Sequence, residues 1–243
     1  MTARWIAPHP RPSPGAMEVF DAKAEQWWQP RGAFAVLHWL AVARADLVPP
    51  AARGGAVLVD LGCGAGLLAP HLAGKGYRHV GVDASPVALA QAAEHGVRAV
   101  RGDVLAVPLA DGCADVVVAG EILEHVTDLR RAVAEACRLL RPGGLLVLDT
   151  LAATALCRWV AVTAVDHLPG RWLPSGVHDP DLLVDRAVLA DECARRGVRL
   201  AVRGIRPSVT DLLAWAVGRV DTVRMVPMAT TAVLFQGRGR KEG

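Results

Sequence analysis

The sequence lacks the features of a secreted, disulfide-stabilised or membrane-spanning protein. Its five cysteines lie far apart with no C-x-x-C pair, so we expect free thiols and a cytoplasmic location. The proline-rich residues 1–15 have no apolar core and do not look like a signal peptide; we expect a disordered leader. The best candidate for a membrane span, 151–165, is only about fifteen residues long and contains Arg158.

Lysine is also scarce, and the basic residues are nearly all arginine. The net charge of +3 is small for 243 residues, and no cluster of basic and aromatic residues accompanies it. We therefore do not expect nucleic acid as a substrate or partner. Together with abundant Ala, Val and Gly, this arginine bias is typical of coding in a GC-rich genome. The length suits one α/β domain, expected over 16–243.

What the chain does contain is an alternation of short apolar runs and alanine-rich segments. This rhythm predicts an α/β fold with a doubly wound, mostly parallel, seven-stranded sheet. The segment 16–48 before it reads as helical, with a break at 30–32. Strands are expected at 56–61, 79–83, 98–101, 115–119, 145–150, 198–204 and 230–237, with a helix near 209–220.

A glycine-rich loop, DLGCGAG, follows the first expected strand and precedes a helical pattern. Glycine lets the backbone turn sharply and approach a ligand that a Cβ would displace. Such a loop at a helix N-terminus is where α/β sheets bind nucleotide-like cofactors. Its G-x-G-x-G spacing differs from the G-x-G-x-x-G of dinucleotide-binding proteins. The predicted cofactor contacts here are Asp60, Gly62, Cys63, Gly64 and Gly66.

Two acids after the next strands extend this cofactor site. Asp83 ends the second expected strand, 21 residues after Gly62, where a carboxylate can accept hydrogen bonds from ribose hydroxyls, and Ala84 follows it. That position suits a nicotinamide cofactor equally well. Asp103, followed by Val104, comes after the third strand and could either contact an adenine amino group or cap a turn.

These motifs, together with the LRPGG turn at 140–144, resemble class I S-adenosylmethionine (SAM) methyltransferases. More selectively, the paired tryptophans before F-x-x-L-H, the EILEHV run, Thr150 with Leu151, and His178 with Asp179 resemble the ubiquinone-biosynthesis O-methyltransferase family over 20–179. The resemblance implies a class I methyltransferase fold with an N-terminal helical lid (16–48) and a substrate-covering insertion after the fifth strand (152–185). It also implies that Arg44 binds the methionine carboxylate of SAM and that Gly120 lines the cofactor site.

The reaction site is expected directly after the fourth strand. If a helix starts there, Glu121, Glu124 and His125 share one face and could hold a divalent cation, for which Mg²⁺ is our expectation. Such an ion would lower the pKa of a phenolic hydroxyl and orient it toward the methyl group. Without a metal, His125 is the first choice of general base. His178 and Asp179 are further catalytic candidates, although a surface turn is an equally good interpretation of that pair.

The sequence departs from the family pattern at two positions. Val177 stands where the family has Thr before its His-Asp pair, and Ala152 stands where it has Asn. These departures bear on the acceptor more than on methyl transfer. We expect an aromatic or quinol small molecule as substrate. The mixed apolar stretch at 152–175 could contact the membrane periphery or cover a hydrophobic pocket.

Three other functions remain open on the sequence. An N- or C-methyltransferase of natural-product tailoring would need no metal. A nicotinamide-dependent oxidoreductase is disfavoured by the glycine spacing and the LRPGG turn. A non-catalytic SAM-binding protein is suggested only by the two departures.

Overall fold

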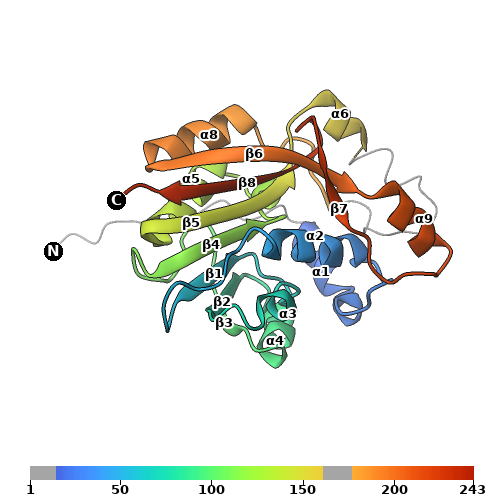
Figure 1. Ribbon diagram of the computed structural model, residues 1–243, viewed down its shortest axis with the longest axis horizontal. Helices are drawn as coiled ribbons and strands as arrows, with labels where there is room; N and C mark the ends of the chain where they lie inside the picture. Colours follow the sequence, from blue (N-terminus) through green and yellow to red (C-terminus); the bar gives the residue numbers. More distant parts are fainter. Residues whose placement is uncertain (1–14, 161–176) are drawn as a thin grey trace.

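The sheet orders the whole molecule in the computed structural model, which describes residues 15–160 and 177–243 (Figure 1). Its order is β3-β2-β1-β4-β5-β8-β6-β7. The strands span Val57–Leu61 (β1), Arg78–Asp83 (β2), Arg98–Arg101 (β3), Ala114–Gly120 (β4), Leu140–Leu151 (β5), Val198–Pro207 (β6), Met225–Met228 (β7) and Leu234–Lys241 (β8). Strands β1 to β5 are parallel, and β8 pairs antiparallel with both β5 and β6.

Helices cover both faces of this sheet (Figure 1). Helices α5 (Leu129–Leu139) and α8 (Arg186–Arg195) pack on one face, and α2 (Ala35–Ala45) and α3 (Ala69–Leu72) on the other. Neighbouring strand residues divide between the two cores, as with Val59 and Leu58. The other elements are α1 (Ala16–Asp21), η1 (Ala24–Gln26), α4 (Pro86–Glu94), η2 (Leu123–His125), α6 (Ala155–Arg158) and α9 (Val209–Ala216).

The predicted doubly wound α/β fold is confirmed, with one strand more than expected. The additional strand is β7, Met225–Met228, which carries a proline and pairs only with β6 at the end of the sheet order. The LRPGG segment also differs from expectation, because it lies inside β5 and does not form a separate turn before it. The pairing of β4 with β5 shifts register between Ala114 and Val116, and Gly143 has a positive φ, so the strand is irregular at these residues.

The N-terminal region contains the predicted break, but it is longer than expected. Helix α1 ends at Asp21, η1 adds three residues, and α2 starts only at Ala35. The predicted leader at 1–15 lies outside the described residues except for Gly15, and so do residues 161–176 of the predicted insertion. Among the residues that are described, no helix is both long and apolar enough to cross a bilayer.

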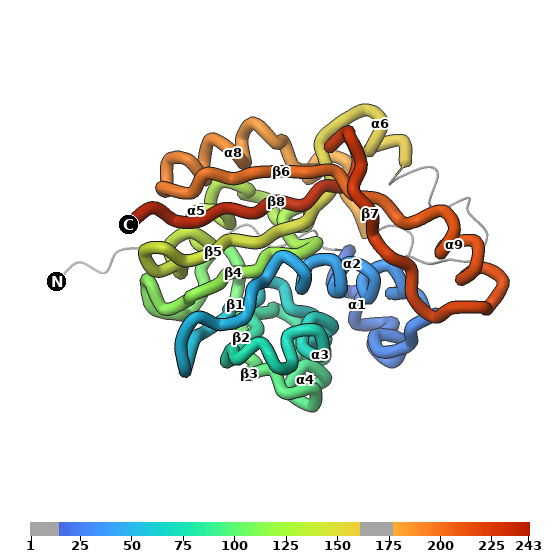
Figure 2. The backbone as a smooth tube through the Cα atoms, in the orientation of Figure 1, coloured from blue at the N-terminus to red at the C-terminus, as the bar shows by residue number. Residues whose placement is uncertain are grey.

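The parallel strands bring four loops together at their carboxyl ends, which lie beside α1 and α2 in the tube view (Figure 2). Helix α4 starts at one of these loops, because Ser85 caps it by accepting a hydrogen bond from the N–H of Ala88 and Pro86 occupies its first turn. The residues predicted as cofactor ligands follow β1, β2, β3 and β4 and therefore converge at this edge.

At the opposite edge, Asp115 joins the starts of several elements. Its carboxylate accepts hydrogen bonds from Arg53 (3.0 and 2.8 Å), from Arg141 Nε (2.7 Å) and from the N–H of Val57 (2.9 Å). Burial alone would raise the pKa of Asp115, but these hydrogen bonds outweigh it and hold the pKa below its ordinary value. The carboxylate therefore ties β1 to β4 and β5 only while it is ionised.

We expect Asp115→Asn to lower the free energy of unfolding by about 1–3 kcal/mol at pH 7. A depressed folded-state pKa contributes stability that is present above the unfolded pKa, about 3.9, and is lost as the pH falls through the folded value. The difference between the two proteins should therefore shrink below about pH 4. Urea unfolding at several pH values measures it. Asp111→Asn, which affects only an exposed ion pair, is the control; an equally large effect there would contradict the assignment.

Candidate active site

A cavity of about 240 Å³ opens at the carboxyl edge of the sheet. Its walls come from α1, from the loops after β1, β2, β3 and β4, and from residues 177–178. Most of the predicted site residues line it: Arg44, Asp60, Gly62, Cys63, Gly64, Asp83, Ala84, Asp103, Val104, Gly120, Glu121, His125 and His178. Residues that are far apart in the sequence thus form one site.

The glycine loop has the backbone that its sequence requires. Gly62, Gly64 and Gly66 all have positive φ values, of 67°, 51° and 83°. A Cβ on Gly64 would overlap the ring of Trp27, and one on Gly62 would overlap Ile122. The loop is therefore closely covered by neighbouring segments, and a side chain at either position would displace them.

Asp83 organises the loops at the part of the cavity where the cofactor contacts were predicted. Its Oδ2 accepts a hydrogen bond from Gly64 N–H (2.9 Å), and its Oδ1 accepts one from Ser85 N–H (2.9 Å). Burial raises the pKa of Asp83, although these backbone hydrogen bonds partly oppose it. The carboxylate is thus under-solvated, and further donors such as ribose hydroxyls would fit it.

A buried ion pair lies beneath the cavity. Arg44 donates from Nε and Nη2 to the two carboxylate oxygens of Asp149, at 2.7 and 2.6 Å. A Cβ on Gly120 would overlap the guanidinium, so only glycine fits there. Burial alone would lower the pKa of Arg44, but the charge of Asp149 raises it above its ordinary value. The pair joins α2 to β5.

Two carboxyl groups follow β4 and interact with each other. Burial, and then the neighbouring charges of Glu124 and Asp149, raise the pKa of Glu121. Burial also raises the pKa of Glu124, whose Oε2 accepts a hydrogen bond from Thr150 Oγ1 at 2.6 Å. Glu121 has a φ of +50°, a costly conformation for a residue with a side chain. The end of β4 thus combines a strained backbone at Glu121 with two carboxyl groups that disfavour each other's ionisation.

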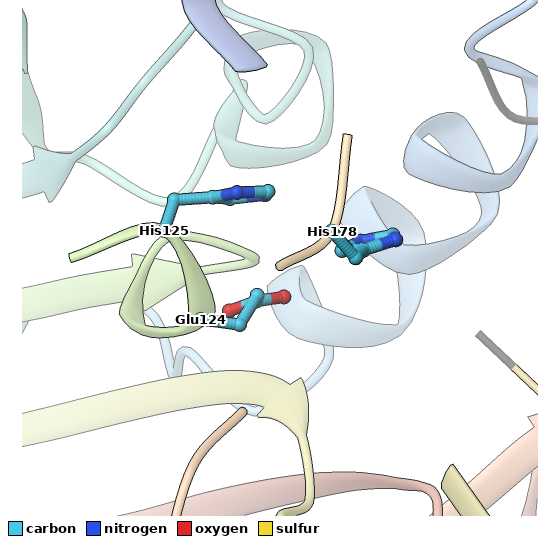
Figure 3. Close-up of side chains that lie close together, drawn as sticks. All are labelled: Glu124, His125 and His178. Carbon is cyan, nitrogen blue, oxygen red and sulfur yellow. The ribbon is translucent and has the colours of Figure 1, made fainter. Parts of the chain in front are cut away.

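Two imidazoles stand beside Glu124 (Figure 3). The rings of His125 and His178 stack with centroids 5.4 Å apart, and one potential ligand atom each from Glu124, His125 and His178 lie within 4.8 Å of one another. Burial lowers the pKa of His125 to about 3, helped by His178, and burial lowers that of His178 to about 4. Both rings are neutral at pH 7.

Aromatic side chains form the wall between the N-terminal segment and this cluster. Phe20 stacks on Trp27 (5.7 Å between ring centroids) and meets the edge of His125 (5.9 Å), while Trp27 stacks on Phe34 at 4.3 Å. Phe20 and Trp27 both line the cavity. A planar aromatic ligand would find matching surfaces here.

Comparison with known proteins identifies the family of this chain. Residues 59–148 match a family described as a methyltransferase domain. The ubiquinone biosynthesis O-methyltransferase of Azorhizobium caulinodans is 34% identical over 207 residues, covering 77% of this chain and 81% of that protein. Its namesake from Methylobacterium sp. is 35% identical, covering 78% and 84%. The chain belongs to the ubiquinone biosynthesis O-methyltransferase family.

Solved structures confirm the class I methyltransferase fold. A SAM-dependent methyltransferase from Thermotoga maritima superposes with a TM-score of 0.64 at 16% identity, covering 93% of this chain and 99% of that one. One from Aquifex aeolicus gives a TM-score of 0.56. Because the chain belongs to this family and its residues 59–148 match a methyltransferase domain, the protein is a SAM-dependent methyltransferase and not a nicotinamide-dependent oxidoreductase, as the glycine spacing indicated.

Three of the predicted site residues, Gly66, Glu124 and Asp179, do not line the cavity. Gly66 packs against Ala92 and Val97 and does not line the cavity. Asp179 is exposed, and its Oδ1 accepts a hydrogen bond from the N–H of Asp181, so it stabilises a turn as the alternative interpretation held.

No helix starts at Glu121, because its left-handed backbone prevents one and only the short η2 follows. The expectation that Glu121 shares one helical face with Glu124 and His125 is therefore wrong. Among the described residues, His178 takes its place in the group that could hold an ion.

Sequence reasoning assigned no role in the site to the two residues that support it from β5, although Thr150 contributed to the family resemblance. Asp149 and Thr150 are fully buried and hold Arg44 and Glu124, respectively. A signal was present, since an acid and a hydroxyl at the end of an apolar strand occupy the same edge as Asp60 and Asp83. Their partners, however, are distant in sequence.

We expect Asp149→Leu alone to lower the free energy of unfolding by about 3–5 kcal/mol, because it leaves the Arg44 charge buried without a partner. Adding Arg44→Met should recover a large part of that loss, since the buried charge is then removed as well. Urea unfolding of the two single variants and the double variant measures the coupling. Additive losses would show that the ion pair does not act as a unit.

Proposed function

We propose that this family member transfers the methyl group of SAM to a phenolic hydroxyl of a quinol-like or catechol-like small molecule, with a divalent cation assisting. The observation that carries the proposal is the position of Glu124, His125 and His178 beside a cavity that the glycine loop also lines. The relatives named as ubiquinone biosynthesis O-methyltransferases support an aromatic hydroxyl as the acceptor. Bound SAM supplies a methyl group made electrophilic by the positively charged sulfur.

The cofactor half of the cavity has donors and acceptors that fit SAM. Asp83 would accept from the ribose hydroxyls, and Arg44 would bind the methionine carboxylate through the guanidinium edge that Asp149 does not occupy. Asp103 lines the cavity, where it would accept a hydrogen bond from the adenine amino group. Its Oδ1 accepts a hydrogen bond from Leu105 N–H, so it also caps a turn. Because glycine has no side chain, the backbone of the glycine loop can come close to the bound ligand.

The N-terminal segment acts in this proposal as the predicted lid. Asp21 accepts a hydrogen bond from Ser85 Oγ (2.6 Å), and the carbonyl of Ala24 accepts one from Gln91 (2.8 Å), which fastens α1 and η1 to α4. The present cavity is smaller than the roughly 300–1,000 Å³ of typical ligand pockets. The lid would therefore open for SAM to bind and close to exclude water.

We expect Asp83→Asn to weaken SAM binding about tenfold or more, because charged hydrogen bonds contribute roughly 1.5–3 kcal/mol. An amide offers one acceptor where Gly64 N–H and Ser85 N–H each need one, so the loop is also disturbed. Calorimetric titration with SAM measures the affinity. Glu94→Gln, on the outer end of α4, is the matched control and should bind as the wild type does. Unchanged affinity in Asp83→Asn would remove it from the cofactor site.

On the acceptor side, we propose that the side chains position the substrate and form no covalent bond with it. The rings of Phe20 and Trp27 would hold a planar substrate, and the Glu124 group would fix its hydroxyl. A divalent cation there would lower the pKa of that hydroxyl and direct it toward the methyl group. Correct placement supplies much of the rate in such a transfer.

The decisive test is methyl transfer followed by mass spectrometry. The protein is incubated with SAM and a panel of catechols, prenylated quinol precursors and monophenols, with a divalent cation or with EDTA. We expect a methylated catechol or quinol that disappears with EDTA and in Glu124→Gln. Product that survives EDTA would contradict metal assistance and favour a metal-free N-, C- or O-methyltransferase. SAM binding without any product would place the acceptor outside this class.

A further inference from the structure

The group of Glu124, His125 and His178 draws its side chains from two separate segments of the chain. Glu124 and His125 come from η2, whereas His178 comes from the segment before α8, more than fifty residues later (Figure 3). In the close-up, the carboxylate of Glu124 and the ring of His125 extend toward the same side as the His178 segment. The fold, and no local motif, brings the third side chain to the other two.

Two buried polar atoms on these side chains have no hydrogen-bond partner among the described residues, unless the neighbouring Glu121 carboxyl is protonated and donates to Glu124. They are Glu124 Oε1 and His125 Nδ1, on side chains that are 0% and 7% exposed. Leaving such atoms unpaired in the interior costs free energy. A cation between them would give both a partner.

A second layer already fixes the carboxylate. Thr150 Oγ1 donates to Glu124 Oε2 at 2.6 Å, and Thr150 is itself fully buried on β5. Thr150 thus fixes Glu124 Oε2, while Glu124 Oε1 stays available to bind an ion. Protein metal sites commonly orient their ligands through such outer hydrogen bonds.

The donor chemistry then limits the ion. Mg²⁺ prefers oxygen ligands and keeps several waters, whereas imidazole suits Zn²⁺ and similar transition ions. We infer that His178 is the third ligand of this site and that its two imidazoles and one carboxylate select a Zn²⁺-like ion over Mg²⁺. The inference deepens the metal assistance of the proposed function and rests on it for any part in methyl transfer.

Binding would draw two segments together. Ligand atoms at about 2.1 Å from one ion lie roughly 3.4 Å apart in a tetrahedral site. The present spread of up to 4.8 Å and the stacked rings therefore require side-chain rotation and a closer approach of residue 178 to η2. A metal that bridges the two segments would also stabilise the folded chain.

Cobalt(II) is the probe, because its visible absorption reports ligand type and number. The metal-free protein is titrated with Co²⁺, and bound Co²⁺ is then challenged with Zn²⁺ and with excess Mg²⁺, while thermal melting follows the fold. The variants are His178→Ala and His178→Gln, with Glu121→Gln to test the oxygen-rich ligand set predicted from sequence. His71→Ala is the control, since it removes an imidazole on α3 outside the cavity lining.

We expect one Co²⁺ per chain, displaced by stoichiometric Zn²⁺ but not by excess Mg²⁺, and a higher melting temperature with Co²⁺ than with Mg²⁺. Both His178 variants should weaken Co²⁺ binding at least about tenfold and change its spectrum, whereas Glu121→Gln should leave the spectrum unchanged and His71→Ala should keep the affinity within about twofold. Metal-free melting curves show whether each variant is folded.

The inference is overturned if Mg²⁺ displaces Co²⁺ at comparable concentration, or if folded His178 variants keep wild-type affinity while Glu121→Gln loses it. These results are separable from the proposed function. Co²⁺ bound through His178 without methylation of any catechol would refute only the proposed acceptor. Methylation that Mg²⁺ restores, with no selective Co²⁺ site, would refute only this inference.

Discussion

The Arg44 guanidinium is the charge on which the carboxyl edge of this protein depends. It pairs with Asp149, and its ionised state is further favoured by the charges of Asp60 and Glu121. Several carboxyl groups would repel one another in so small and buried a space without a cation among them. Because α2 supplies that cation, the N-terminal region contributes to the charge balance of the site.

This arrangement divides the cavity by chemistry. On one side, Asp83 and the glycine loop present acceptors and close backbone contacts suited to a nucleoside. On the other, neutral imidazoles and a pair of carboxyl groups with raised pKa values meet an aromatic wall. Between the halves lies Gly120, which must be glycine because the guanidinium occupies the place of a Cβ. In the proposed reaction, SAM and an aromatic acceptor would meet above this buried ion pair.

Much of this was predictable because the relevant signals are local. Apolar runs, capping residues such as Ser85 and glycines at positive φ act within a few residues, so five parallel strands and the cofactor loop could be placed from sequence. Strand β7 could not, since its four residues include a proline and only pairing with β6 makes it a strand. The register shift at the start of β5 was likewise invisible, because it depends on the neighbouring strand.

The sequence by itself determined the fold class, the family and the set of acids and glycines at one edge of the sheet, because regular topology carries strand ends to the same place. Only the tertiary structure decided their partners. It turned Glu121 away from helical geometry, set His178 beside Glu124 and buried Asp149 against Arg44. These contacts join segments that are many residues apart in the sequence. They depend on burial and on the balance of charges in the folded protein, which no local sequence pattern predicts.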